Sequence, residues 1–359
     1  MYALVCSDVH SQTPPRPFHS PWSVAPSISL KKYLLGIAEF DKLEALNLND
    51  HIKGTRTVVY VTLIFIQLLF GVNFVASKYV LNHINSWDFV FVRFFVSGLT
   101  LSLITLAIYA YKKKISSVIL PTRYILWAIA LGILGFALSQ TLFLQGLKMT
   151  TAANTSIFST TIPLLAYLVA ILRGKKQFNF VDVFGFTTAF LGVLILKGVD
   201  QVSFDKQNLV GDLVVFLGCF SIATFISFSK DFFTKVPSVV GTAYLLTFGS
   251  LFLAPVTFYD SNFAWIELIW QDTYFMSALL FTIFGATLLT YLLSNWTLKK
   301  ISSETLALYI FIQPVVATLL AYFFLDGELK WHMGVSLVFI AAGVGAVSLK
   351  EAHERNSNR

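Results

Sequence analysis

Long continuous runs of apolar residues, separated by short polar segments, make up most of the chain. A helix that crosses a membrane needs about 20 mostly apolar residues, and ten uncharged runs approach or exceed this length. The runs are 58–77, 94–111, 124–147, 149–172, 183–196, 213–229, 236–259, 273–298, 305–325 and 333–349. Because they are continuously apolar rather than alternating, they exclude a membrane β-barrel and predict an all-α integral membrane protein with ten transmembrane helices.

The fifth run is the weakest of the ten. Its 14 uncharged residues, 183–196, can span a bilayer only if the helix begins near Asn179 and carries Asp182 at the membrane interface. The distribution of basic residues favours an even number of spans, which supports this helix.

The first 56 residues differ from the rest. Five of the ten prolines lie between Pro14 and Pro26, a density that prevents a regular helix. Residues 30–46 alternate apolar and charged side chains, which fits an amphipathic helix on the membrane surface and equally a disordered tail. Residues 1–56 and 350–359 are therefore expected to be the N-terminal and C-terminal cytoplasmic tails.

Composition agrees with a polytopic membrane protein. The 359 residues are 56% hydrophobic and 13% charged, with a mean hydropathy of +0.72, whereas soluble domains carry about 25% charged residues. These values exclude a cytosolic enzyme, a disordered chain and a nucleic-acid-binding module. The expected partners are the lipid bilayer and a small-molecule substrate, not nucleic acid.

The net charge of +7 comes from basic residues in the connecting segments. The N-terminal tail has six of them, the other segments on its side of a ten-span arrangement have fourteen, and the opposite segments have five. Because basic residues collect on the cytoplasmic side, both termini are predicted to be cytoplasmic, in the inner or plasma membrane. The segment 260–272 has three acids and no basic residue, and it is predicted to face outward.

The second half of the chain repeats the first. A shift of 151 residues aligns the halves without a gap from residue 147 to the end of the tenth span, and it places Pro163 on Pro314 and Gly192 on Gly343. Each half, 57–199 and 208–349, then holds five spans. Because five is odd, the second half enters the membrane in the opposite direction. Such inverted repeats suit alternating access.

Several landmarks occur in the order and spacing of one known family. They are Phe70-Gly71-Val72-Asn73-Phe74 with Ser77-Lys78 in the first span, Arg93 in the second, Pro163 and Pro314 in the fourth and ninth, and Leu325-Asp326-Gly327-Glu328 closing the ninth. Over residues 57–349 the chain resembles the drug/metabolite transporter superfamily, EamA type. Two positions depart from that family: Phe70 replaces the usual tryptophan, and Gln177 stands where the first half usually closes with Glu.

This resemblance implies a secondary transporter for amino acids and related metabolites, or for drug-like compounds, working as an exporter or exchanger. It also implies a cavity formed by spans one, three, four, six, eight and nine. A nucleotide-sugar or organophosphate exchanger is the alternative among transporters, although it would need several basic residues in the cavity. A sensor without transport activity is a further alternative.

An intramembrane enzyme is the alternative from another class. The six histidines lie in the tail or at span ends, so no buried group of His, Asp and Glu is expected for acid–base or metal chemistry. We therefore expect no enzyme activity, no cofactor and no metal site. All 19 acids also lie outside the uncharged runs, so no titrating carboxylate is expected at the middle of the membrane.

Arg93 is the only basic residue well inside a predicted span. It lies about six residues from the outer end, which corresponds to roughly 9 Å at 1.5 Å per residue. A charge at this depth is costly and is often functional. Arg93 either binds an anion or gates the pathway, or its long side chain extends to the lipid headgroups.

Uncharged polar residues inside the spans are the other candidates for the substrate cavity. Tyr291 and Asn295 lie one turn apart on one face of the eighth span, and Gln140 is the repeat equivalent of Tyr291. The alternative for each is a hydrogen bond between helices. The further candidates are Asn73, Asn154, Tyr167 and Gln313.

Pro163 and Pro314 are predicted to be matched mid-helix kinks, or hinges, at which the two halves flex, since a proline removes one i→i−4 hydrogen bond.

Small residues form faces on two other spans. Gly185, Ala189 and Gly192 share one face of the fifth, and the tenth carries the run around Gly343, including Ala341, Ala342 and Gly345. Such faces permit close packing within the chain and equally across a homodimer.

The predicted topology can be tested by cysteine labelling. In a background without Cys6 and Cys219, a cysteine replacing Asn262 should react with a membrane-impermeant thiol reagent on intact cells, because segment 260–272 is predicted to face outward. A cysteine replacing Ser116 should react only after the membrane is opened. Labelling of the Ser116 variant alone on intact cells would reverse the orientation.

Overall fold

The computed structural model describes residues 52–150, 152–197, 208–261, 263–324 and 331–357. Within these ranges the chain forms helices and short connections, with no strand among them. Seven of the described helices are long and apolar enough to cross a membrane. Shorter apolar helices occur at Ile157–Leu172, Phe180–Leu196 and Ser303–Val316. The prediction of an all-helical membrane protein is thus confirmed, while the proposed surface helix at 30–46 lies outside the described residues.

Each of the two halves contributes a comparable series of helices. The first series is α2 (Ile52–Leu81), α3 (Ser86–Tyr111), α4 (Thr122–Gly132), η3 (Ile133–Leu138), α5 (Ser139–Met149), α6 (Ala152–Ser159), α7 (Ile162–Leu172) and α8 (Phe180–Lys197). The second is α9 (Leu209–Phe233), α10 (Ser238–Asp260), α12 (Thr273–Leu280), η6 (Phe281–Leu289), α13 (Thr290–Leu298), α14 (Ser303–Leu308), η7 (Tyr309–Ile312), α15 (Gln313–Phe324) and α16 (Trp331–Ser357). Three short helices, η2 (Ile115–Ser117), η5 (Ala264–Ile266) and α11 (Leu268–Gln271), lie in the connections.

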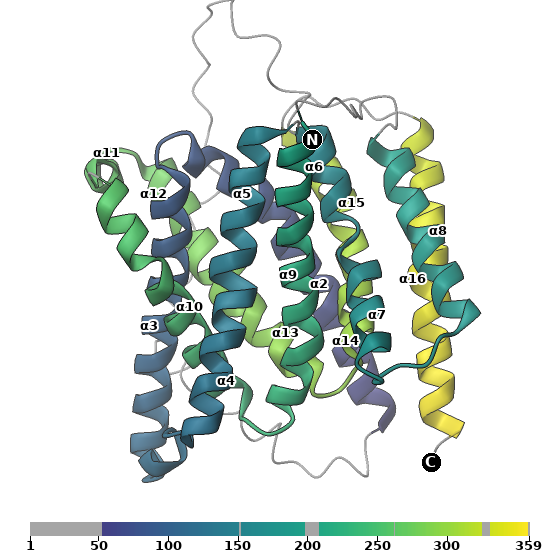
Figure 1. Ribbon diagram of the computed structural model, residues 1–359, viewed down its shortest axis with the longest axis horizontal. Helices are drawn as coiled ribbons and strands as arrows, with labels where there is room; N and C mark the ends of the chain where they lie inside the picture. The colour runs from purple at the N-terminus through teal and green to yellow at the C-terminus, as the bar shows by residue number, and fades with distance from the viewer. Residues whose placement is uncertain (1–51, 151, 198–207, 262, 325–330, 358–359) are drawn as a thin grey trace, which may run out of the picture.

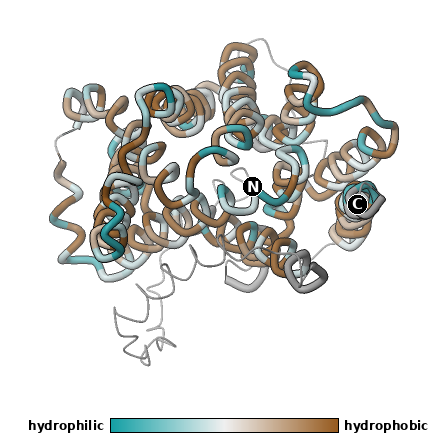
Figure 2. The backbone as a smooth tube through the Cα atoms, turned by 90° about the horizontal axis from the view of Figure 1, so that it is seen from below, coloured by the Kyte–Doolittle hydropathy of each residue, from teal (hydrophilic) through white to brown (hydrophobic). Residues whose placement is uncertain are grey.

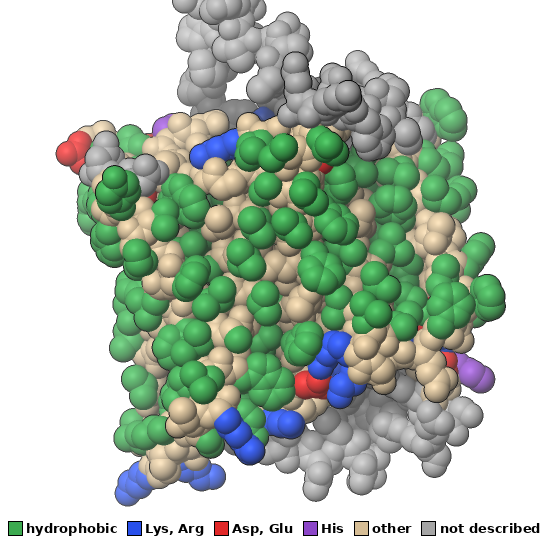
Figure 3. Space-filling model, viewed as in Figure 1, with side chains coloured by type: hydrophobic (Ala, Val, Ile, Leu, Met, Phe, Trp, Pro, Cys, Tyr) green, Lys and Arg blue, Asp and Glu red, His purple; other side chains and the backbone are tan. Residues whose placement is uncertain are grey.

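The helices stand side by side as one bundle, with the start of α2 and the end of α16 at its lower end in Figure 1. Tyr60 of α2 stacks on Tyr309 at a centroid distance of 6.3 Å, and the Tyr309 hydroxyl lies 3.5 Å from Ser348 of α16, so these two ends are close. From below, the helices are mostly brown and white, and teal shows in the connections (Figure 2). On the face shown in Figure 3, hydrophobic side chains cover the middle and Lys and Arg lie mainly along the lower edge.

Side-chain caps fix where several helices begin. Asn85 accepts the N–H of Asp88 at the start of α3, and Asp272 accepts those of Tyr274 and Phe275 at the start of α12. These contacts satisfy N–H groups that have no partner within the helix. The side chains therefore set the ends of the apolar helices.

The fifth helix begins as the sequence predicts. The structure starts α8 at Phe180, directly after Asn179, whose side chain accepts the N–H of Val181 at 2.8 Å. Asp182 lies in the first turn and is buried, where it accepts a hydrogen bond from Lys350 at 2.8 Å. The ion pair compensates the cost of burying the carboxylate at this position.

Departures from α-helix geometry recur at the same spacing as the sequence repeat. The π-helical segment Ile133–Leu138 in the first half corresponds, at the offset of 151, to the last six residues of the π-helical segment Phe281–Leu289. Likewise, the break between Ser159 and Ile162 corresponds to the 3-10 turn Tyr309–Ile312. Irregular backbone thus occurs at equivalent positions of the two halves.

The two prolines follow these breaks. Pro163 is in the first turn of α7, and Pro314 is the second residue of α15. The prediction of mid-helix prolines was wrong in this respect, because the α-helix is interrupted before each proline. A proline suits a first turn, where the missing N–H costs no hydrogen bond. It also disfavours α-helical geometry in the residue before it.

The face of small residues on α8 packs against α16 of the same chain. A Cβ on Gly185 would meet Gly343 and Val347, and one on Gly192 would meet Ser336 and Ile340. The residue 151 positions after Gly185 is Ser336, and the residue 151 positions before Gly343 is Gly192. The contact of Gly185 with Gly343 thus has its repeat equivalent in the contact of Ser336 with Gly192. The contact between α8 and α16 is therefore related to itself by the repeat, and both helices lie side by side in Figure 1.

Other neighbouring helices follow the same relation. Helix α5 lies beside α9 and α13 beside α2, α7 lies beside α9 and α15 beside α2, and η3 lies beside α10 and η6 beside α3. In each of these three cases, replacing both helices of the first pair by their repeat equivalents in the other half gives the second pair.

Gly343 and Gly345 provide a matched test of the α8–α16 contact. A Cβ on Gly343 would clash with the Gly185 carbonyl and the backbone of Ala189, whereas one on Gly345 has nothing within 4 Å. Gly343→Ala should therefore lower the free energy of unfolding in detergent by about 1–3 kcal/mol, and Gly345→Ala should leave it nearly unchanged. Equal stability of the two variants would refute the importance of this contact.

Candidate functional site

Arg93 lies inside the bundle rather than at its edge. The residue is 7% exposed, its Nε donates to the Thr287 hydroxyl, and its Nη2 lies 3.5 Å from the Ala286 carbonyl oxygen. The guanidinium carbon is 5.8 and 5.4 Å from the ring centroids of Phe89 and Phe94, distances at which aromatic faces attract a cation. These contacts direct Arg93 toward the eighth span and not toward the headgroups.

The π-helical segment of the eighth span supplies the groups that hold Arg93. The Thr287 hydroxyl donates to the carbonyl of Thr282, five residues earlier, while accepting from Arg93. One turn further along α3, Ser97 donates to the Ile283 carbonyl at 2.8 Å. The π geometry thus frees backbone and hydroxyl acceptors that face α3, a use that is common for π-helical segments at functional sites.

Tyr291 follows Thr287 by one turn and lies among aromatic rings from three other helices. Its ring centroid is 4.7 Å from Phe136, 6.1 Å from Phe94 and 6.1 Å from Phe70, each approaching edge to face. Tyr291 is 9% exposed, and among the described residues its hydroxyl has no hydrogen-bond partner. The Phe94 ring centroid also lies 5.4 Å from the guanidinium carbon of Arg93, so both side chains adjoin the same ring. Arg93 and Tyr291 therefore form one buried polar site packed against aromatic rings.

The other polar candidates occupy separate places. Asn295, which shares a face with Tyr291 in the sequence, donates to the Thr242 hydroxyl of α10 at 2.8 Å and is fully buried. Gln313 donates to Gln67 of α2 at 2.7 Å. For both, the geometry is that of a hydrogen bond between helices.

Asn154 and Tyr167 lie toward opposite ends of the bundle. Asn154 donates to both Asp212 oxygens at 3.0 and 3.1 Å, joining α6 to the start of α9. The Tyr167 hydroxyl accepts the N–H of Asn179 at 3.0 Å. Neither contact adjoins Arg93. Asn73 accepts from Ser77 within α2.

Gln140 is half-buried on α5. Residues 325–328, which close the ninth span in the sequence, lie outside the described residues.

Sequence reasoning missed the partners of these groups. Gln67 is 2% exposed. It is one of only two side-chain amides in the first apolar run, the other being Asn73. An amide among apolar residues indicates a buried hydrogen bond, so the sequence could have identified Gln67 as a candidate. Thr242 carries no such signal, because buried threonines are common in these helices and only the packing of α10 on α13 identifies it.

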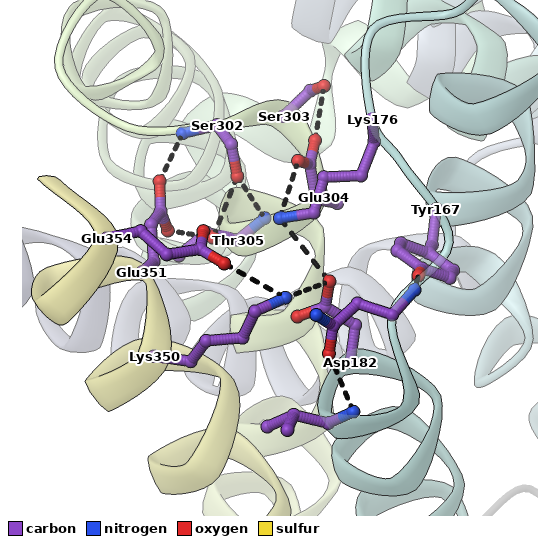
Figure 4. A network of polar contacts seen from close by, with 12 residues as sticks. Tyr167, Lys176, Asp182, Ser302, Ser303, Glu304, Thr305, Lys350, Glu351 and Glu354 are labelled. Atoms are coloured by element: carbon purple, nitrogen blue, oxygen red, sulfur yellow. Dashed lines mark hydrogen bonds and ion pairs between the residues drawn. The ribbon is translucent and has the colours of Figure 1, made fainter. Parts of the chain in front are cut away.

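A network of charged residues links the two halves at the lower end of the bundle (Figure 4). Asp182 at the start of α8 binds Lys350 of α16 at 2.8 Å and Lys176 at 3.4 Å. Lys176 also lies 3.5 Å from Glu304 of α14. Burial lowers the pKa of Lys176, but the surrounding carboxylates, led by Glu304, outweigh this and raise it, so the ammonium stays charged near neutral pH.

Helix α16 completes this network. Glu351 accepts the N–H of Ser302 at 3.0 Å and the Thr305 hydroxyl, which holds the start of α14. Among the described residues no group of three His, Cys, Asp or Glu could hold a metal ion. The acids of this region are instead neutralised by lysines.

Comparisons with known proteins agree with this architecture. The profile described as "EamA-like transporter family" matches residues 57–197 and again 209–349. The chain is 23% identical over 287 residues to uncharacterized transporter YoaV of Bacillus subtilis (strain 168), covering 80% of this chain and 95% of that protein. It is 24% identical over 288 residues to uncharacterized transporter YyaM of the same organism, covering 80% and 92%.

More distant similarities extend to a plant protein and to a solved fold. WAT1-related protein At4g30420 of Arabidopsis thaliana is 24% identical over 247 residues, covering 61% of this chain and 65% of that protein. A crystal structure described only as "Crystal structure of protein" superposes with a TM-score of 0.69 at 17% identity, covering 83% of this chain and 98% of that one. Because the family profile matches most of the chain, and does so twice, the protein is a multi-pass membrane protein that belongs to the EamA-like transporter family.

Proposed function

We propose that this protein is a ten-span secondary transporter that moves a small polar or amphipathic metabolite by alternating access. The observation that carries the proposal is the exchange of contacts between halves. The α8–α16 contact is related to itself by the shift of 151, and three further pairs of neighbours are related to each other. Two halves of opposite orientation with equivalent contacts can exchange conformations and open one site to either side.

The ends of the bundle supply contacts that can open in turn. At the lower end, Asp182 and Glu304 bind lysines across the halves, and at the other end Asp212 of the second half binds Asn154 of the first. Asp182 and Glu304 are buried at these contacts, so water must reach the carboxylates and lysines as the pairs separate. Such contacts hold an end closed until the helices move apart.

The orientation of this transporter follows from the basic residues. Figure 3 places most Lys and Arg of the visible face along the lower edge, the side at which α16 ends. The positive-inside rule assigns that side to the cytoplasm. The central site then lies between a cytoplasmic network and an outer contact.

The site favours metabolites over nucleotide sugars or organophosphates. Arg93 is the one basic residue of the aromatic site among the described residues. A phosphate dianion or diphosphate would bring more negative charge than a single guanidinium can compensate in a medium of low dielectric constant.

Transport can be measured by counterflow in proteoliposomes loaded with members of a panel of amino acids and related metabolites. We expect accelerated exchange for at least one class, and we expect concentrative uptake to be independent of an imposed pH gradient at clamped potential. The reason is that Asp88, Asp182, Asp212 and Glu304 all lie in first turns of helices, away from the middle of the membrane. Uptake that requires the pH gradient and disappears in Glu328→Gln would contradict this expectation.

The breaks before Pro163 and Pro314 should act as hinges. Replacing either proline with alanine restores an N–H that can bond to the carbonyl four residues earlier, which extends the helix across the break. Pro163→Ala and Pro314→Ala should therefore insert normally and slow turnover, most of all together. Pro255→Ala, inside α10 and without a proline at the equivalent position, is the matched control and should keep the wild-type rate. Wild-type turnover in the double variant would exclude the hinge.

A further inference from the structure

We infer that Arg93 and Tyr291 form the subsite for the carboxylate of a small monocarboxylic substrate with an apolar body. This inference rests on the proposed transport function and names its substrate class.

The guanidinium of Arg93 has a charge without a protein counter-ion. Among the described residues no ion pair joins it to a carboxylate, and its contacts are to Thr287, the Ala286 carbonyl and the rings of Phe89 and Phe94. Its two hydrogen bonds engage Nε and Nη2, which leaves Nη1 without a partner in the described part of the chain. A buried cation keeps a net cost unless an anion compensates it.

Tyr291 supplies a second donor at the same place. Its hydroxyl is unpaired among the described residues although the side chain is nine-tenths buried. The Phe94 ring contacts both Arg93 and Tyr291, so the two polar groups adjoin one aromatic surface. A guanidinium edge and a phenol can together donate to the two oxygens of one carboxylate.

The contacts of Arg93 orient it for this purpose. Thr287 accepts from Nε and is itself held by its bond to Thr282, so the plane of the guanidinium is fixed before a ligand arrives. A pre-oriented donor loses less freedom on binding than a mobile one. The one charge of the site matches a monocarboxylate and not a dianion.

The lining describes the remainder of the ligand. Phe70, Phe94 and Phe136 lie around the Tyr291 ring at centroid distances between 4.7 and 6.1 Å. Phe94 and Phe136 are fully buried, whereas Phe70 is half-buried and is the ring that a ligand can reach. This ring favours an aromatic or branched aliphatic group and offers no hydrogen bond to a polar body. Only 7% of Arg93 and 9% of Tyr291 are exposed, so a ligand bound to them is shielded from water on most sides.

Binding to the purified full-length protein in detergent can be measured by titration calorimetry with three matched pairs. The pairs are phenylacetate with phenylacetamide, 4-methylpentanoate with 4-methylpentanamide, and L-phenylalanine with phenethylamine. We expect at least one acid to bind tenfold or more tightly than its partner, because only the acid carries a carboxylate that can serve as the counter-ion of Arg93. Equal affinity within all three pairs would overturn the inference.

Variants separate a binding role from a structural one. Tyr291→Phe keeps the ring and should weaken binding of the preferred acid about fivefold to tenfold, while Tyr244→Phe, whose hydroxyl donates to the Val118 carbonyl, should leave it unchanged. Arg93→Gln should abolish the preference for the acid, and Arg93→Lys should retain it in weaker form. Preference for the acid that persists in Arg93→Gln, or affinity unchanged in Tyr291→Phe, would refute the subsite.

Counterflow of the same compounds distinguishes this inference from the function on which it rests. Acid binding without flux would contradict transport and leave the subsite intact. Flux of the partners that lack a carboxylate as fast as that of the acids would contradict the subsite and leave transport intact.

Discussion

The interior of a membrane offers no water to a polar group, so a hydrogen-bonding side chain there is costly unless it finds a partner in the protein or in a ligand. This constraint accounts for the pairing of Asn295 with Thr242, of Gln313 with Gln67, and of Asp182 with Lys350. The last two of these pairs join the first half of the chain to the second. The polar contacts thus fix how the halves face each other, and close packing of glycines between α8 and α16 sets their distance.

The helices could be predicted because continuous apolar runs have one stable structure in lipid, and the repeat could be predicted because Pro163 and Pro314 share an offset. The hydrogen-bond partners of the polar side chains could not be predicted, because they depend on the rotation of each helix and on packing between segments distant in the sequence. Arg93 illustrates the limit. Its position inside the span could be predicted from the sequence. Its hydrogen bond to Thr287 could not, because the π-helical segment that carries Thr287 has no distinguishing pattern within the apolar run. Similarly, the equivalent positions of the two prolines could be predicted, but the helix breaks that precede them could not.

The π-helical and 3-10 segments lower the stability of the helices that contain them. A helix that served only as a membrane anchor would have no use for such segments. A π-helical segment or a 3-10 turn weakens the hydrogen-bond ladder and leaves carbonyls to be satisfied elsewhere. Here Ser97 and Arg93 take up the carbonyls of Ile283 and Ala286. The irregular segments recur at the repeat offset in both halves, and of these η6 lies beside Arg93, because it carries Thr287. In η6 the departure from α-helix geometry and the polar groups that hold Arg93 therefore have a common structural origin.

A fixed positive charge at the centre has a consequence for energetics that does not need a titrating acid. With a monocarboxylate bound to Arg93 the loaded site is neutral, whereas the empty site carries one positive charge. A potential that is negative inside therefore has little effect on the loaded protein and favours inward movement of the empty site, by up to about 2.3 kcal/mol per charge for each 100 mV. Under the transport function and the carboxylate subsite proposed above, the cycle so driven carries the anion outward. In this scheme the resident guanidinium couples transport to the membrane potential, which is consistent with acids that remain at the helix ends as structural partners rather than proton carriers.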